Sequence, residues 1–170
     1  MNLEQLTTEM QHNARRIQAM VDGVGDEQAR WKPDAETWSV LEVVNHLYDE
    51  ERHDFRTRLD YILHKPGEPW PANRPQEWVT ERRYNERDLH ESLQNFLDER
   101  QQSMDWLQSL TDIDWERSET APWGATMSAG TMFASWVAHD VLHLRQLAEL
   151  HREWIVRQSE PYSTYYAGEW

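Results

Sequence analysis

The stretch Val137-Ala138-His139-Asp140-Val141-Leu142-His143-Leu144-Arg145-Gln146-Leu147 combines helical apolar spacing with two histidines four residues apart. On a helix, side chains at positions i and i+4 lie one above the other on the same face. Two imidazoles placed in this way can bind one metal ion together. A third ligand must come from another segment, and the best candidate is His46, within residues 38–47. The sequence therefore predicts a helical bundle that holds one divalent metal ion between these two segments.

Four segments repeat apolar residues every three or four positions, which is typical of amphipathic helices. They cover residues 3–22, residues 39–63, a third segment that starts between 80 and 85 and ends near 110, and a fourth that starts near 128 and passes 155. Ser39 and Glu42 are spaced as a capping box at the start of the second helix. We expect a single domain over residues 1–170 that folds as an all-α four-helix bundle.

The connections between these helices are expected to be irregular. Residues 26–37 separate the first two helices, and four prolines between residues 66 and 75 exclude regular structure until about residue 79. Residues 111–127 form the next predicted loop, and residues 160–170 form an aromatic tail that could fold back on the body or meet a partner. No pattern of strands, no repeat and no second domain is visible.

Composition and charge exclude several functions. The chain has no cysteine, which rules out disulfides, thiolate metal ligands and a cysteine nucleophile. Its formal net charge of −14 repels phosphate backbones and anionic lipid, so we expect no nucleic-acid or membrane partner. The N-terminus does not resemble a signal peptide, and no apolar run approaches the length of a membrane span. A cytoplasmic location is the resulting expectation.

The helical positions of the three histidines favour a site near the surface of the bundle. His139 and His143 lie on one flank of a wide apolar stripe, and His46 lies on a flank beside Val43. Ligands at the edge of a core suit a site that a substrate can reach. The alternative is that each histidine is a packed, hydrogen-bonded side chain without a metal.

The other histidines are weaker candidates. Glu9-x-x-His12 and Glu50-x-x-His53 match half of the di-iron motif of helical bundles, but His12 should face solvent and the later helices offer no inward glutamates. His53 could line the mouth of a cavity, although a solvated position is the expected one. The sequence gives His64, His90 and His151 no defined partner.

Three charged residues occupy apolar stripes. Arg100 falls at the centre of the third helical stripe, Glu51 at the centre of the second, and Asp140 near the middle of the fourth. Unpaired buried charges are costly, so we expect Glu51 and Arg100, with Asp140 as a further member, to form a buried polar network. Alternatively, Asp140 orients a ligand histidine, or the helix rotations expose these groups.

The motifs resemble those of a known family. Residues 38–47 are similar to the second-helix signature of the DinB/YfiT-like metalloenzymes, and Gly124 with residues 139–147 is similar to the second signature of that family. Trp31-Lys32-Pro33 and Phe96-x-x-x-Arg100 also fit. The resemblance covers most of the chain and implies a four-helix bundle with a non-standard connection order.

The resemblance also implies a cofactor and a range of activities. It implies one divalent metal ion, zinc or nickel in relatives, held by His46, His139 and His143; some relatives have glutamate at the position of His139. Relatives include S-transferases that use bacillithiol or mycothiol, a mycothiol-dependent maleylpyruvate isomerase, and proteins regarded as hydrolases. Homodimers occur in the superfamily. The DinB name gives no reason to expect DNA binding.

Three neutral imidazoles would leave a metal ion with open positions, as in catalytic sites. A bound water would be acidified for hydrolysis, or a thiol cosubstrate would bind as thiolate, and the sequence does not choose between them. Glu50, one turn after His46, is the nearest candidate for a general base; the alternative is a solvated surface carboxylate. Arg52 and Arg145 could bind an anionic cosubstrate. A metal-binding bundle that acts as a sensor or interaction protein is the non-enzymatic alternative.

Overall fold

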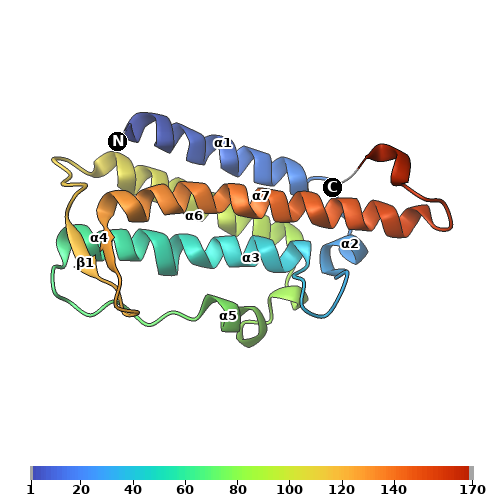
Figure 1. Ribbon diagram of the computed structural model, residues 1–170, viewed down its shortest axis with the longest axis horizontal. Helices are drawn as coiled ribbons and strands as arrows, with labels where there is room; N and C mark the ends of the chain where they lie inside the picture. The colour runs from blue at the N-terminus through green and yellow to red at the C-terminus, as the bar shows by residue number, and fades with distance from the viewer. Residues whose placement is uncertain (1, 169–170) are drawn as a thin grey trace.

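The structure of the protein, a computed structural model, describes residues 2–168 and is a four-helix bundle. Four long helical segments run roughly along the long axis of the molecule (Figure 1). The first, third and fourth are α1 (Leu3–Val21), α6 (Leu89–Ser109) and α7 (Ala129–Ser159). The second is continuous through α3 (Val40–Glu50), a π-helical turn η1 (Glu51–Phe55) and α4 (Arg56–His64). The predicted fold class is confirmed.

Short elements occupy the connections. They are α2 (Asp26–Arg30), α5 (Pro75–Glu81), the 3-10 turns η2 (Tyr84–Glu86) and η3 (Tyr165–Ala167), and the antiparallel strands β1 (Ser118–Thr120) and β2 (Thr126–Ser128).

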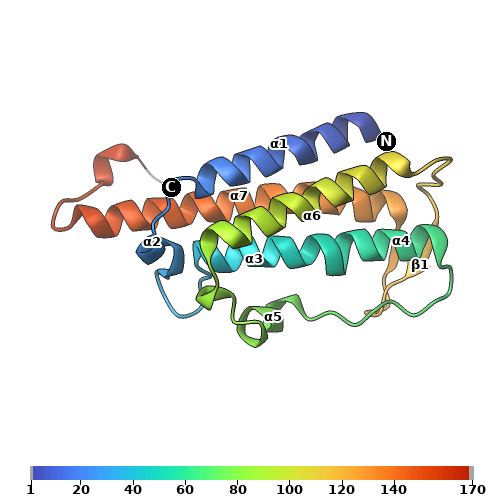
Figure 2. The same ribbon diagram turned by 180° about the vertical axis from the view of Figure 1, so that it is seen from behind.

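Helices that are neighbours in sequence do not all pack side by side. The helix α1 packs against α6 and α7, and α3 packs against the same two helices from the other side. The first two long segments therefore lie across the bundle from each other, and the view from behind shows α6 between α1 and α3 (Figure 2). This order places α3 beside α7, so that residues about 95 positions apart in sequence can share one site.

Each long segment begins at a side-chain cap. The Asn2 side chain accepts a hydrogen bond from the Gln5 amide, and Ser39 forms the predicted capping box with Glu42. Asp88 accepts from the Glu91 amide at 2.8 Å, which fixes the start of α6. The predicted start between residues 80 and 85 was therefore several residues too early. These caps satisfy amide groups that a helix otherwise leaves without partners.

The irregular connections contain more structure than the sequence predicted. The helix α5 begins at Pro75, because proline is compatible with the first turn of a helix. The helix α2 lies within residues 26–37, which were expected to be irregular. The absence of strands was a wrong prediction: β1 and β2 form a hairpin whose turn contains Gly124 at φ +86°. Strands of three residues are too short to show a period of two in the sequence.

Two large apolar clusters make up most of the core, one toward each end of the bundle, and a small third cluster contains Trp78, Val79 and Tyr84. The first contains Ile17, Leu41 and Phe96, and the second contains Leu59, Met104 and Phe133. Along α6, Arg100 lies between the cluster residues Phe96 and Met104. A buried polar layer therefore separates the two apolar clusters at mid-bundle, at the level of the histidines.

The C-terminal tail turns back beyond the end of α7 (Figure 1). Thr164 and Ala167 line a cavity together with Met20 and α7 residues, so the tail approaches the body of the protein. Its three tyrosines, Tyr162, Tyr165 and Tyr166, are at least 80% exposed. Trp170, which was predicted as part of this aromatic tail, lies outside the described residues.

Candidate metal centre

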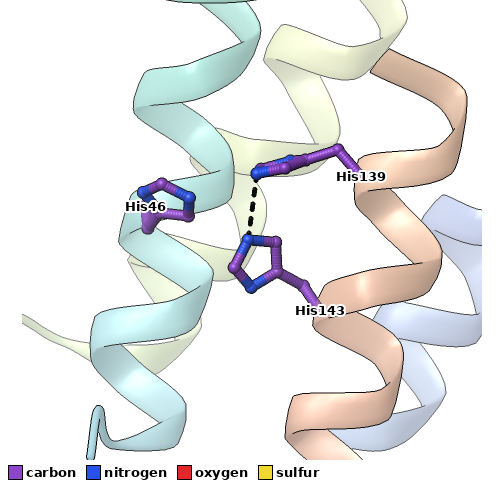
Figure 3. A group of neighbouring side chains, drawn as sticks. All are labelled: His46, His139 and His143. Atoms are coloured by element: carbon purple, nitrogen blue, oxygen red, sulfur yellow. Dashed lines mark hydrogen bonds between the residues drawn. The ribbon is translucent and has the colours of Figure 1, made fainter. Parts of the chain in front are cut away.

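Three histidines converge from two helices. His46 on α3 faces His139 and His143 on α7 (Figure 3). Each of the three offers one ring nitrogen, and these nitrogens all lie within 4.8 Å of one another. The Nε2 atoms of His139 and His143 are 3.1 Å apart, as the i, i+4 spacing predicts. Thus the fold brings together the residues that the sequence singled out.

The donor set fits a divalent metal ion. Two nitrogens that each lie about 2.1 Å from one zinc ion can be separated by at most about 4.2 Å. The 3.1 Å between the two α7 histidines satisfies this limit, and the nitrogen that His46 offers lies within 4.8 Å of both. The Nδ1 atom of His46 is buried, has no hydrogen-bond partner among the described residues and lies 3.9 Å from the Glu50 carboxylate. Three neutral imidazoles at this spacing are a donor set that suits zinc or nickel.

Burial keeps these imidazoles neutral. Desolvation lowers the pKa of His46 to about 2, with further contributions from His143 and His139. Desolvation, followed by the proximity of His143 and Arg100, lowers the pKa of His139 to about 3. The pKa of His143 is also lowered by burial, which its hydrogen bond to Gln146 opposes. Neutral imidazole is the form that binds metal ions.

A glutamine orients one of the three rings. The Nδ1 atom of His143 lies 2.8 Å from the Oε1 atom of Gln146, and an amide oxygen can only accept a hydrogen bond. This contact assigns the proton of His143 to Nδ1 and leaves Nε2 free as an electron-pair donor. Partners of this type fix the tautomer of ligand histidines. The sequence prediction had not assigned Gln146 a role, although it lies three residues after His143.

The histidines form the floor of a cavity of about 570 Å³. Trp38 lines it beside His46, with 4.7 Å between the ring centroids, and Leu142 and Pro75 contribute apolar wall. Phe55 packs against His139 from the other side, at 4.9 Å between ring centroids. The sequence did not identify Trp38 as a wall of the site, because its position depends on how residues 31–39 cross the end of α3.

Glu50 lies at the same cavity and is buried. Its side chain is 5% exposed, and its carboxylate approaches His46 Nδ1 to 3.9 Å. The alternative of a solvated surface carboxylate is therefore wrong. Desolvation, followed by the nearby Asp54 carboxylate, raises the pKa of Glu50 well above its usual range, while Arg58 opposes this effect. In the metal-free protein, Glu50 is consequently protonated at neutral pH.

This burial predicts a pH-dependent stability difference. Because the folded-state pKa of Glu50 is raised, the folded protein retains a proton that the unfolded chain loses above about pH 4.5. The contribution of Glu50 to the free energy of unfolding therefore falls as the pH rises. The fall is about 1.4 kcal/mol per pH unit, which gives about 2.5 kcal/mol between pH 5 and pH 7. We therefore expect the free energy of unfolding of metal-free Glu50→Gln, relative to that of wild type, to rise by this amount between pH 5 and pH 7. Chemical denaturation at several pH values measures it.

The comparison between variants isolates Glu50 from the histidines. Buried neutral histidines have lowered pKa values, so their contribution is lost as pH falls below about 6.5, but it is equal in both proteins and cancels. The exposed carboxylate Glu68 lies outside the cavity and provides the control, because Glu68→Gln removes one carboxylate and should not reproduce the gain of Glu50→Gln. A pH-independent difference for Glu50→Gln would show that Glu50 is ionised in the folded protein.

The predicted buried network is confirmed and lies beside the histidines. Arg100 donates two hydrogen bonds to Asp140, at 2.9 and 2.7 Å, and one from Nε to Glu51 at 2.9 Å. Trp136 Nε1 also donates to Glu51, at 2.8 Å. Arg100 donates a further bond to the carbonyl of Met10, which ties α1 to the network. Asp140 therefore pairs with Arg100, and within residues 2–168 no hydrogen bond or ion pair joins it to a histidine ring.

The remaining sequence candidates lie outside the cluster. His53 is exposed, and its ring contacts Trp78 instead. His12 is paired with Glu9, and its side chain is 44% exposed, as predicted. Arg52 is bound to Asp49, and Arg145 is bound to Glu149. Neither arginine lines the cavity over the histidines.

The fold and the site place the chain among helical-bundle proteins in which three histidines converge from the second and the last long segments. The family model described as the DinB superfamily matches residues 9–147. The chain belongs to this superfamily, and the sequence-based recognition is confirmed.

Solved structures support the fold assignment. YfiT from Bacillus subtilis, described as a probable metal-dependent hydrolase with an unusual four-helix bundle topology, superposes with a TM-score of 0.79 at 18% identity, covering 89% of this chain and 86% of YfiT. A mycothiol-dependent maleylpyruvate isomerase superposes with a TM-score of 0.66 at 15% identity, covering 86% of this chain. This chain spans 61% of the isomerase. The search of curated proteins returned no match.

Among the described residues, every helix is too short or too polar to cross a membrane.

Proposed function

We propose that this protein is a divalent-metal-dependent hydrolase in which His46, His139 and His143 hold one zinc or nickel ion. One observation carries the proposal: three neutral imidazoles offer their nitrogens within 4.8 Å of one another at the floor of a cavity. Three protein ligands leave open coordination positions, which is the pattern of a catalytic rather than a structural site. When bound, the metal would acidify a water molecule and supply a hydroxide nucleophile near neutral pH.

Four further residues that line the cavity have distinct roles in the proposed reaction. Gln146 holds His143 in the tautomer that exposes Nε2. Glu50 accepts and returns a proton, because its buried carboxyl lines the same cavity and the positive charge of a bound ion favours its ionised form. Trp38 and Leu142 limit the access of bulk water to the histidines. A raised pKa in the metal-free protein makes Glu50 a group whose proton can be exchanged near neutral pH.

A thiol S-transferase is the second candidate. The similarity to a mycothiol-dependent isomerase supports it, since a thiolate could occupy an open metal position. The third alternative is a non-catalytic metal-binding bundle that acts as a sensor or interaction protein. An open cavity of about 570 Å³ above the histidines favours an enzyme over this alternative, because a purely structural site needs no space for a substrate.

The proposal predicts metal-dependent hydrolysis. Chelated protein should be inactive toward a panel of ester and amide substrates, and addition of zinc or nickel at one equivalent should restore turnover. Glu50→Gln should retain the metal but lower kcat by about 10²-fold or more, as expected when a general base is lost. Metal content is measured by mass spectrometry on the same samples. Stoichiometric metal without hydrolysis, but with thiol transfer, would favour the second candidate.

A further inference from the structure

The outer wall of the cavity carries carboxylates and no cation. Its described lining includes Glu36 and Glu149 at the mouth, whereas no lysine or arginine lines it. A second cavity of about 340 Å³ shares Thr37, Gln146 and Glu149 with the first. The two cavities are therefore adjacent, and carboxylates are part of the lining of both.

Further carboxylates line the second cavity. Asp34 and Glu153 are part of its wall. The side chain of Asp34 accepts hydrogen bonds from the Thr37 and Glu36 amides, and these bonds, led by that from Thr37, lower the pKa of Asp34. Its carboxyl therefore stays ionised well below neutral pH. Carboxylates therefore line both cavities: Glu36 and Glu149 in the first, and Asp34, Glu149 and Glu153 in the second.

Two of these carboxylates already have cationic partners, since Arg152 pairs with Glu153 and Arg145 with Glu149, but no cation of the described chain is part of either cavity lining. Arg145 pairs with Glu149 at 2.8 Å, but its side chain is 76% exposed and belongs to neither cavity wall. Glu36 has no cationic partner among residues 2–168. At least one carboxyl group of the cavity lining, that of Glu36, therefore has no cationic partner among the described residues.

The deep end of the same cavity contains partnerless polar atoms. His46 Nδ1 and Glu50 Oε1 are both buried, lack a hydrogen bond within the described chain, and belong to residues that line the cavity. Each of these residues is at least nine-tenths buried. Trp38 lines the same cavity, and an indole face is a surface to which cations are attracted. The cavity therefore combines unsatisfied buried polar atoms at the histidines with carboxylates and an aromatic ring elsewhere in its lining.

We propose that the substrate of this site carries a positively charged nitrogen group, such as an ammonium or amidinium, held by Glu36, Glu149 and the face of Trp38. The reacting group of the same molecule then lies at the histidines. This inference rests on the proposed function, because it places the reacting group at the metal ion. It also disfavours thiol cosubstrates that carry carboxylates, since the cavity wall offers no cation to pair with them.

The test uses three small thiols of similar size that differ in charge. Cysteamine is cationic, 2-mercaptoethanol is neutral and 3-mercaptopropionate carries a carboxylate. Each is titrated into cobalt-loaded protein, and the near-ultraviolet absorption from sulfur bound to cobalt reports the Kd without any turnover. We expect the protein to bind cysteamine most tightly. The preference is the Kd of 3-mercaptopropionate divided by the Kd of cysteamine. In the double variant Glu36→Gln/Glu149→Gln this ratio should fall by about fivefold, because two carboxylates of the cavity lining are removed.

Differences in intrinsic thiol acidity cancel, since the same three thiols are compared between proteins. The matched control, Glu68→Gln/Glu160→Gln, removes two exposed carboxylates outside both cavities and should leave the preference unchanged. An equal fall in both double variants, or none in either, would overturn the inference and leave the metal centre intact. Absence of the visible absorption bands of bound cobalt would overturn the metal centre and, with it, this inference.

Discussion

Replacing Arg100 by methionine is expected to lower the free energy of unfolding by about 3–5 kcal/mol, the range found when one partner of a buried ion pair is removed. Arg100 is 2% exposed and is the one cation bonded to both Glu51 and Asp140 in the described chain. Without it, two carboxylates stay buried between helices with no opposite charge. Urea denaturation of the purified variant measures the loss.

Two comparisons separate charge burial from loss of packing. Arg83→Met removes an exposed arginine paired with Glu86 and should cost far less stability than the loss of Arg100. The triple variant Arg100→Met/Glu51→Gln/Asp140→Asn removes all three charges and should recover part of the lost stability, because no ionised carboxylate is then left unpaired. If Arg100→Met were no more harmful than Arg83→Met, the network would not contribute to stability.

Replacing His139 by alanine is expected to abolish stoichiometric metal binding. Two imidazoles remain in the variant, and one of the three nitrogens that lie within 4.8 Å of one another is lost. Wild-type protein should contain about one metal ion per chain. A metal that binds only the folded state should also stabilise wild type by about 2.7 kcal/mol at a hundredfold excess over its Kd, and this increment should vanish in the variant.

The histidine control is His12→Ala, because His12 lies outside the cluster and its side chain is 44% exposed. Metal content by mass spectrometry and thermal denaturation with and without added zinc are measured for all three proteins. His12→Ala should behave as wild type. Unfolding curves of the chelated proteins establish that His139→Ala still folds. Equal metal content in His139→Ala and wild type would contradict the proposed ligand set, and a lack of metal in both would contradict the metal centre.

The network and the histidines are adjacent on α7, and this adjacency suggests why a costly buried charge is present. Asp140 follows His139 directly, and its two bonds to Arg100 fix the position of that turn of α7 relative to α6. Glu51 follows Glu50, and its bonds to Arg100 and Trp136 do the same for the start of the π-helical turn that continues α3. The same arginine therefore positions both helices that carry the histidines.

The sequence by itself determined the helical segments, the histidine pair and the charged network. These depend on local rules: helical spacing places His139 and His143 on one face, and a charge in an apolar stripe, such as Arg100, needs a partner. The cap at Ser39 was also visible, because a capping box involves residues only three positions apart. Local patterns of this kind do not depend on how the helices are arranged.

Only the tertiary structure decided what surrounds the histidines. The burial of Glu50 was not predictable, because it depends on the packing of the π-helical turn against the rest of the bundle. The cavity wall joins Glu36 with Glu149, which are more than a hundred residues apart, and a helical period carries no information about such a contact. The connection order that places α1 and α3 across the bundle brings α3 beside α7. Because packing of distant segments sets burial and local charge, the chemistry around the histidines follows from the fold.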